Sequence, residues 1–536
     1  MIRFMTIQHL TPSSMFGANG LSRWLASARA GLAVCTACLV LALQPGRAHA
    51  EALYTKDGAF DVHTVRGLAE KLAKQPYKAP AKVPETLDKL SYDEYRAIRF
   101  RPDRAVWANQ DLPYRMQMFL SGFYYKEPVE IAVVQGGQAR HLRYQPSMFT
   151  VEPPAQVTLP EQDVGFSGLR LHTQLNEPNI WDELLVFQGA SYFRSLGKNQ
   201  GWGLSARGLT LRTGAAEGEE FPMFRAFWVE QPRSQTNLIT VHALLDSPSV
   251  TGAYQFIVRP GDETVMDVRA TLFPRTELKD VGLAPGTSMF YFAANDRLGV
   301  DDFRPQVHDS DGLLMINGRN ERLWRPLANP SKLQISAFVD SSPIGFGLMQ
   351  RDRNFANYQD LEAHYERRPS LWVEPQGDWG DGEVVLVEIP TESEVHDNIV
   401  AFWRPGQPLP AGKPYEFSYR LSWGVGPRTK FGEVRVDATR VGRAEVASPT
   451  PRRLFVIDYA VPRDGSPLPD ELPKAELSAS VGETSNVNVR RHPLIDGYRV
   501  SFELDPKNEQ LVELRLSLEM PDKRAAETWV YRWTPE

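Results

Sequence analysis

The sequence contains little cysteine, and its first 50 residues contain no acidic residue at all. Both cysteines, Cys35 and Cys38, lie within these 50 residues, where the only charges are four arginines. An uninterrupted stretch of apolar and small residues runs from Ala30 to Leu43, and Ala-His-Ala ends the segment at Ala50. A positive start, a short apolar region and an A-x-A end are typical of a secretory signal peptide. We therefore expect cleavage after Ala50 and export of the rest of the chain.

This apolar stretch is too short to cross a bilayer as a helix, which needs about 20 residues. An N-terminal anchor that is never cleaved is the alternative interpretation. No Arg-Arg pair precedes the stretch, so the sequence does not indicate a twin-arginine export route. No other segment approaches transmembrane length, and we expect no stable membrane insertion.

Without its first 50 residues the chain has no cysteine, which excludes disulfide bonds as a source of stability. Burial of apolar side chains must therefore stabilise the fold. The remaining chain of roughly 485 residues is longer than one hydrophobic core usually serves. The length predicts two or more domains.

The exported chain is acidic. The whole sequence has 60 basic and 66 acidic residues, and removal of the four N-terminal arginines leaves 56 and 66, a net charge of −10. Such a charge argues against nucleic acid or an anionic membrane surface as a partner. A neutral ligand such as an unmodified polysaccharide fits the composition.

Helical patterns are few and lie near the start of the exported chain. Asp61 is placed to cap a helix that Pro76 ends, and a second short helix is predicted from Tyr92 to Ile98. The apolar face of the first helix would consist of Val62, Val65, Leu68 and Leu72.

From about residue 115 onward, apolar and polar residues alternate with a period of two, which indicates half-buried β-strands. Clusters of Gly, Pro, Asn and Asp separate the strands at the spacing typical of an all-β sandwich. The clearest predicted strands are Leu169–Leu175, Tyr254–Val258, Val265–Phe273, Val384–Ile389 and Tyr415–Trp423. The predicted fold class is all-β.

A glycine-rich interruption predicts a linker over residues 425–436, between a domain of residues 51–424 and a domain of residues 437–536. The final 100 residues have the size and strand rhythm of an immunoglobulin-like sandwich. The predicted strands in this part are Arg453–Tyr459, Tyr498–Leu504, Leu511–Met520 and Glu527–Trp533.

The sequence contains no Walker A loop, no His-Glu-x-x-His, no Gly-x-Ser-x-Gly and no EF-hand loop. Asp309-Ser-Asp311-Gly312 has the spacing of a calcium loop, but the third ligand and the distal glutamate are missing. An Asx-type turn between strands is the preferred interpretation. His308 and His396 have no third ligand candidate, so we predict neither a metal site nor a cofactor.

Carboxylates next to aromatic residues are the remaining candidates for chemistry. They cluster at residues 308–311, 365–372 and 392–398. Glycoside hydrolysis needs one carboxylic acid to protonate the leaving oxygen and one carboxylate to activate water. Asp397 lies just before an apolar strand, where partial burial would raise its pKa as an acid requires. Because the chain has 66 acidic residues, a solvated loop face is the alternative for each cluster.

Several short segments along the chain together resemble the periplasmic glucan biosynthesis proteins G and D (OpgG/OpgD, also called MdoG/MdoD). These segments occur in order over nearly the whole exported chain. They are Gly189–Arg194, Gly203–Leu209, Glu219–Pro222, Leu244–Ser247, Thr251–Tyr254, Thr287–Phe290, His308–Ser310, Trp324–Leu327, Gly345–Leu348, Arg368–Ser370, Glu388–Thr391, Asp397–Val400 and Glu527–Tyr531.

The resemblance implies a periplasmic protein with a large, galactose mutarotase-like β-sandwich that carries a long cleft, and a small immunoglobulin-like domain. It implies a role in making osmoregulated periplasmic glucans, whose backbone is β-1,2-linked glucose. Some family members are β-1,2-glucanases that cut with inversion. Carried over, Asp397 would be the general acid. Asp309 would be the general base, and would reach the attacking water through a relay that involves Tyr365 and Glu394.

Three functions stay open from the sequence: an inverting endo-β-1,2-glucanase, a non-catalytic glucan-binding scaffold, and a branching transglycosylase. The inner-membrane glucan synthase is a candidate partner, and a homodimer is conceivable. Trp324, Trp372 and Tyr192 are predicted to stack on sugar rings, with core packing as the alternative for each. D-type proteins generally carry a twin-arginine signal, which is missing here. Residues 371–375 and 492–499 nevertheless look D-like, so G-like or D-like activity is undecided.

Overall fold

The computed structural model describes residues 52–427, 433–445, 450–461 and 468–535. The predicted signal peptide lies outside these residues. The described chain consists almost entirely of β-strands arranged in packed sheets, which confirms the predicted all-β class. Within the described residues, no helix combines the length and the apolar character needed to cross a bilayer.

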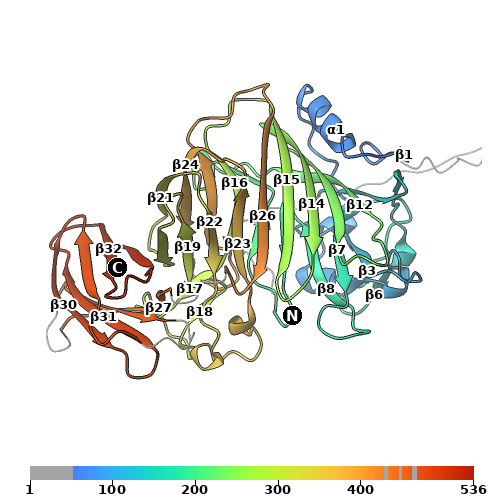
Figure 1. Cartoon of the computed structure of the whole chain (residues 1–536). Coiled ribbons are helices and arrows are strands. Elements are labelled where there is room, and N and C mark those ends of the chain that lie inside the picture. Colours follow the sequence, from blue (N-terminus) through green and yellow to red (C-terminus); the bar gives the residue numbers. More distant parts are fainter. Residues whose placement is uncertain (1–51, 428–432, 446–449, 462–467, 536) are drawn as a thin grey trace, which may run out of the picture.

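A sheet of 15 strands runs across the whole molecule (Figure 1). In spatial order its strands are β1 (Gly58–Ala59), β5 (Gln138–His141), β4 (Glu130–Gln135), β12 (Met223–Glu230), β13 (Ile239–Asp246), β14 (Val250–Arg259), β15 (Thr264–Pro274), β26 (Tyr415–Gly424), β23 (Ser370–Gln376), β22 (Gly345–Met349), β19 (Gly312–Ile316), β20 (Arg322–Pro326), β33 (Thr528–Trp533), β32 (Val512–Glu519) and β29 (Lys474–Ala479). The β12–β4 and β20–β33 pairs are parallel. The second of these joins the C-terminal part to the rest of the sheet.

A second sheet has ten strands, and its neighbouring strands pair antiparallel. Its strands are β21 (Gln334–Ser341), β24 (Asp381–Glu388), β25 (Ile399–Pro405), β16 (Val281–Ser288), β10 (Ser205–Arg207), β9 (Tyr192–Ser195), β8 (Asp182–Gln188), β7 (Phe166–Thr173) and β3 (Tyr114–Leu120), with β11 (Leu209–Leu211) paired to β16. Two short pairs lie outside both sheets: β17 (Phe290–Phe292) with β18 (Val307–His308), and β2 (Ile98–Phe100) with β6 (Phe149–Val151).

The main hydrophobic core lies between the 15-stranded and the 10-stranded sheets. Phe187 of β8 packs edge-to-face on Phe256 of β14, with ring centroids 5.2 Å apart. Phe193 of β9 packs in the same way on Trp423 of β26, at 5.8 Å. Burial of each such side chain contributes about 1.5–3 kcal/mol relative to exposure. The alternation seen in the sequence therefore marks strands that each place one face against this shared core.

The α-helices of the described residues are short and precede most strands: α1 (Thr64–Ala73), α2 (Glu85–Asp88) and α3 (Tyr92–Arg96). Both predicted helices are thus present. Helix α1 packs Val65 and Ala69 on the outer face of the large sheet. Val62 is 64% exposed, because the helix begins two residues later than predicted. Short 3-10 helices lie at η1 (Pro102–Arg104), η2 (Pro146–Met148), η3 (Phe355–Asn357) and η4 (Tyr365–Arg367).

The C-terminal part is a second, smaller sandwich. Its four-stranded sheet consists of β27 (Arg435–Arg443), β28 (Arg453–Ala460), β31 (Gly497–Asp505) and β30 (Glu483–Arg491). This sheet faces β33, β32 and β29 across a shared core in which Phe455 packs on Trp529, with ring centroids 5.9 Å apart. Residues 428–432 of the predicted linker lie outside the described residues, and β27 begins before the predicted end of that linker.

Candidate active site

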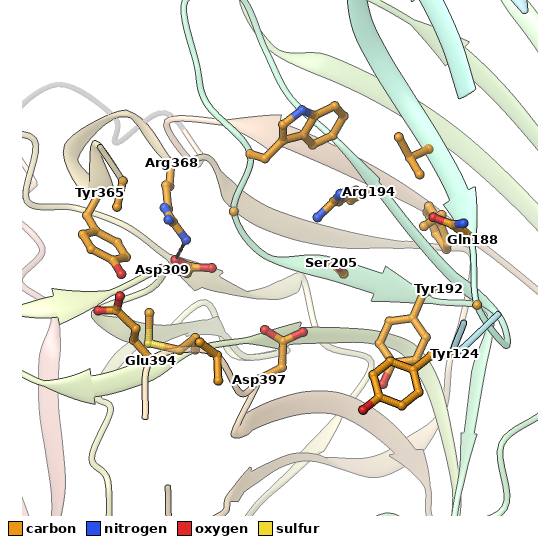
Figure 2. A pocket seen from close by; sticks show the side chains of 18 of the residues that line it. Tyr124, Gln188, Tyr192, Arg194, Ser205, Asp309, Tyr365, Arg368, Glu394 and Asp397 are labelled. Carbon is orange, nitrogen blue, oxygen red and sulfur yellow. Dashed lines mark hydrogen bonds and ion pairs between the residues drawn. The ribbon is translucent and has the colours of Figure 1, made fainter. Parts of the chain in front are cut away.

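A cavity of about 510 Å³ lies where strands β8 and β9 of the second sheet meet three loops (Figure 2). The loops contain Asp309, residues 360–368 between β22 and β23, and residues 394–397 between β24 and β25. Ligand sites of proteins usually have volumes of about 300–1,000 Å³. All four residues assigned to catalysis from the resemblance, Asp309, Tyr365, Glu394 and Asp397, line this cavity. The fold therefore gathers residues that are up to 88 positions apart in the chain.

Asp309 is buried in the cavity wall, directly after β18. Its backbone N–H donates to the Met289 carbonyl at 2.8 Å, and Arg368 Nη1 donates to its Oδ1. Burial raises the pKa of Asp309 to about 6, although the Arg368 guanidinium opposes this increase. The carboxylate of Asp397 contributes to the increase by charge repulsion. Asp309 is therefore mostly ionised at neutral pH but more basic than an ordinary aspartate.

Asp397 comes from the loop that leads into β25, and its side chain stays exposed at the cavity. The next residue, Asn398, fixes this loop: its Oδ1 accepts the Phe290 N–H at 2.8 Å and its Nδ2 donates to the Ile389 carbonyl at 3.0 Å. The surrounding protein raises the pKa of Asp397 by removing solvent from the carboxyl group. Nearby arginines, chiefly Arg207, lower it but do not cancel the effect. The raised pKa makes this carboxyl easier to protonate than an ordinary aspartate.

Tyr365 and Arg368 lie on the same turn, η4 and the residue after it. Tyr365 is 2% exposed, and the Arg368 guanidinium lies over its ring, 4.2 Å from the centroid. Burial raises the pKa of Tyr365, so its phenol stays protonated at neutral pH. The fully buried Gln350 anchors this turn, because its Nε2 donates to the carbonyls of Tyr365 and His308 at 2.9 Å each.

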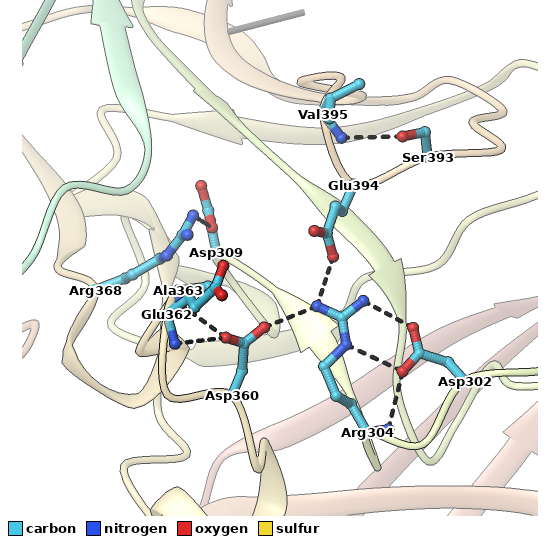
Figure 3. A network of polar contacts seen from close by, with 10 residues as sticks. All are labelled: Asp302, Arg304, Asp309, Asp360, Glu362, Ala363, Arg368, Ser393, Glu394 and Val395. Atoms are coloured by element: carbon cyan, nitrogen blue, oxygen red, sulfur yellow. Dashed lines mark hydrogen bonds and ion pairs between the residues drawn. The ribbon is translucent and has the colours of Figure 1, made fainter. Parts of the chain in front are cut away.

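Glu394 points toward Tyr365 at the same end of the cavity (Figure 2). Its Oε2 lies 2.7 Å from Nη1 of Arg304. The same guanidinium also binds Asp302 and Asp360, so one arginine joins three carboxylates (Figure 3).

The opposite wall comes from the second sheet. The burial of β9 alternates, and since Phe193 faces the core, Tyr192 and Arg194 face the cavity. Arg207 of β10 lies over the Tyr192 ring, 4.5 Å from its centroid. The Arg194 guanidinium lies 4.9 Å from the centroid of the Trp202 ring. The structure thus places Tyr192 in the cavity beside cationic groups.

The structure corrects the two tryptophans predicted to stack on sugars. Trp324 and Trp372 are 4% and 3% exposed and belong to the core shared with the C-terminal sandwich, not to the cavity wall. The Arg351 guanidinium covers the Trp324 ring at 3.6 Å. Trp372 Nε1 donates to Glu374 Oε1 at 3.2 Å. Both side chains therefore pack in the core, which was the alternative interpretation. Their strands, β20 and β23, turn them toward the C-terminal sandwich.

Sequence reasoning missed four residues of this region: Arg368, Arg304, Trp202 and Tyr124. Trp202 and Tyr124 line the cavity, and Tyr124 is 50% exposed. Arg368 lies in one of the segments that carry the family resemblance, which was a signal for it. Nothing in the sequence near Arg304 indicates its three partners, because two of them, Asp360 and Glu394, are more than 50 residues away.

The histidines and Asp311 do not form a metal site in the structure. Among the described residues, no group of three His, Cys, Asp or Glu side chains is arranged to hold a metal ion. His308 is fully buried, and its Nδ1 lies 2.8 Å from Gln350 Oε1. Burial lowers the pKa of His308 to about 4, so the ring is neutral. Asp311 accepts the backbone N–H groups of Arg351 and Asp352 and lies outside the cavity lining.

The arrangement has the parts that acid–base chemistry needs. An exposed carboxyl with a raised pKa and a buried carboxyl with a pKa near 6 line the same cavity. A protonated phenol and a further carboxylate lie beside them. Two carboxyl groups held in different environments can serve as acid and base in one reaction.

Comparisons with known proteins agree with the resemblance found in the sequence. Residues 60–533 match the family model described as "Periplasmic glucan biosynthesis protein, MdoG". Over 482 residues the chain is 59% identical to "Glucans biosynthesis protein G" of Shewanella baltica (strain OS195), covering 90% of this chain and 88% of that protein. It is 60% identical to the protein of the same description from Vibrio cholerae serotype O1 (strain ATCC 39541), with the same coverage.

Proposed function

The chain belongs to the MdoG family of periplasmic glucan biosynthesis proteins, and we propose that it is an inverting endo-β-1,2-glucanase that acts on the glucan backbone. The observation that carries this proposal is the contrast between the two aspartates of the cavity. Asp397 opens onto the cavity, whereas Asp309 is buried in the cavity wall, where Arg368 binds its Oδ1. Inverting glycosidases need one carboxylic acid that reaches the leaving oxygen and one carboxylate that activates water.

In this mechanism Asp397 protonates the glycosidic oxygen as the bond from C1 to that oxygen breaks. A water molecule attacks C1 from the opposite face of the sugar ring, which inverts the configuration. The proton of this water passes through the relay of Glu394 and Tyr365 to Asp309. Since each relay member gives one proton and receives one, both end the step unchanged. Arg368 occupies Oδ1 of Asp309, so Oδ2 receives the proton.

The aromatic side chains of the cavity would bind the sugar rings. Trp202, Tyr124 and Tyr192 line it, and flat apolar faces pack well on pyranose rings. The cationic groups over Trp202 and Tyr192 fix the orientation of these rings. A synthase as partner and a homodimer stay predictions from the sequence.

The test is incubation of linear β-1,2-glucan with the purified mature protein and with Asp397→Asn, followed by product sizing and NMR of the first anomer released. We expect shortened chains that carry the inverted anomer from the wild type only. Asp309→Asn should also be inactive. The matched control is Asp311→Asn: burial raises the pKa of Asp311 to about 6 as well, yet it lies outside the cavity, so this variant should keep activity.

The other outcomes separate the remaining functions. Glucan binding without products from any variant would overturn the proposal in favour of a scaffold. Branched products from the wild type would indicate a transglycosylase. Equal fragments from the wild type and Asp397→Asn would point to a contaminating hydrolase.

A further inference from the structure

A single guanidinium, that of Arg304, joins three carboxylates from separate parts of the chain (Figure 3). Its Nε and Nη2 bind both oxygens of Asp302 at 3.0 and 2.7 Å. Its Nη1 binds Asp360 Oδ2 at 2.8 Å and lies 2.7 Å from Glu394 Oε2. The Arg304 side chain is only 12% exposed. Ion pairs of this kind are strengthened by partial burial and by fixed geometry.

Two of these three partners, Glu394 and Asp360, lie on the loops that carry the proposed relay. Glu394 is itself a relay residue. Asp360 Oδ1 accepts the N–H groups of Glu362 and Ala363 at 2.9 and 2.8 Å, and this turn leads directly into Tyr365. His364 within it has a positive φ of 45°, a strained conformation that the surrounding contacts must maintain. The contact between Arg304 and Asp360 therefore fixes the turn that positions Tyr365.

The three carboxylates depend on Arg304 because its positive charge separates them. Although burial opposes it, hydrogen bonds from Ala363 and Arg304 lower the pKa of Asp360. The hydrogen bonds of Arg304 also lower the pKa of Asp302. Without the guanidinium, three carboxyl groups would face one another, and like charges in such a setting repel. Arg297 donates to the backbone carbonyl of Asp302 at 3.0 Å, and Arg368 is bound to Asp309.

We propose that Arg304 is a positioning residue that holds the loop of Glu394 against the loop of Tyr365, so that a proton can pass between them. Arg304 does not line the cavity, so it acts through its partners and does not touch the substrate. The kinetic part of this inference rests on the proposed glucanase function, whereas the effect on the two loops does not.

The kinetic test compares Arg304→Met with Arg404→Met as a matched control. Arg404 also binds two carboxylates, Glu383 at 2.6 Å and Asp280 at 3.6 Å, but lies away from the cavity. Since misplacement of catalytic groups by about 1 Å costs on the order of 100-fold, Arg304→Met should lower kcat about 100-fold. KM should stay within about threefold of the wild type, because the sugar-binding wall is intact. Arg404→Met should change neither constant.

Two further variants distinguish positioning from general destabilisation. Arg304→Lys keeps the charge and should recover about a tenth of the wild-type kcat. In a Glu394→Gln background, Arg304→Met should cost far less than it does alone, since residues that act as one unit show non-additive effects. Full additivity, or a loss of activity equal to that in Arg404→Met, would overturn the proposal.

Hydrogen exchange tests the same inference without any turnover. Arg304→Met should speed exchange of the backbone amides in 361–365 and in 393–396 together, while Arg404→Met leaves both segments unchanged. If the wild type proves inactive on glucan, the proposed function fails, yet this experiment still decides the role of Arg304. Unchanged exchange in either segment would refute that role.

Discussion

At the junction of the two sandwiches an arginine after the end of β22 and a carboxylate just before β33 neutralise each other, whereas around the cavity the same kinds of group are incompletely paired. Arg351 binds both oxygens of Glu527 at 2.8 and 2.7 Å and donates to the Val436 carbonyl at 2.7 Å. Glu527 also accepts the Val436 N–H at 2.9 Å. Around the cavity, Asp309 and Asp397 face an open space, and the pKa of each is raised.

The difference lies in how completely each carboxylate is neutralised. Glu527 is 1% exposed and has a bidentate partner and a backbone donor, which is the arrangement that a buried charge requires. Asp309 has one arginine partner and a neighbouring carboxylate, so burial leaves it easier to protonate. A satisfied ion pair stabilises the junction, and an incompletely compensated carboxyl can exchange protons.

The largest effect is expected from removal of the junction pair. Glu527→Ala leaves Arg351 without its bidentate partner and should lower the free energy of unfolding by about 3–5 kcal/mol. Denaturant unfolding measures this change. The control is Glu513→Ala, which breaks a pair whose glutamate side chain is 47% exposed and should cost less than about 1 kcal/mol. At temperatures where the protein stays folded, Glu527→Ala should keep its activity on glucan. Lost activity with unchanged stability would contradict the purely structural role of Glu527.

Activity and stability should respond to pH in opposite directions. The base must be ionised, so kcat/KM should fall about tenfold for each pH unit below about 6. The raised pKa values of Asp309 and Asp311 mean that the native state binds protons more tightly than the unfolded state. Their contribution to stability therefore increases as pH falls from about 6 toward 4.

A pH–rate profile and thermal unfolding over this range check both statements. Asp311→Asn should keep the acid limb of the rate profile, because Asp311 does not line the cavity. It should remove part of the gain in stability at low pH. An acid limb that moves in Asp311→Asn would place the titrating group outside the cavity.

The smallest effect is expected from an aromatic residue of the cavity. Trp202→Ala should weaken binding of β-1,2-glucan about fivefold, since an aromatic contact contributes about 1 kcal/mol beyond its buried area. Calorimetric titration of the inactive Asp397→Asn background measures this affinity. The matched control is Trp181→Ala: Trp181 also lies under an arginine, with Arg115 at 3.9 Å, but outside the cavity. Equal losses in both variants would remove Trp202 from the binding surface.

Much of the fold could be predicted because strand and helix patterns are local. The predicted strand Tyr415–Trp423 is β26, which differs by one residue, and Val265–Phe273 lies within β15. Helix α1 was also predicted, with its start too early by two residues. The parallel pairing of β20 with β33 could not be predicted, because it joins residues more than 200 positions apart without a local signal.

The site could be predicted only in part. A lone aspartate in an acidic chain has no feature that distinguishes a catalytic carboxyl from a solvated one, so the assignment of Asp309 and Asp397 depended on the resemblance. The stacking role predicted for Trp324 is wrong, because the residues of a strand do not show which of its two faces meets a cavity. Arg304 was missed because its role consists of contacts with distant loops.

The sequence by itself determined the all-β class, the two helices and the membership of the family, because these follow from periodicity and from matched segments. Only the tertiary structure decided which carboxyl groups share a cavity, which are neutralised by arginine, and which tryptophans are core. These properties depend on burial and on charges within a few ångströms, and the chain brings such groups together only when it folds.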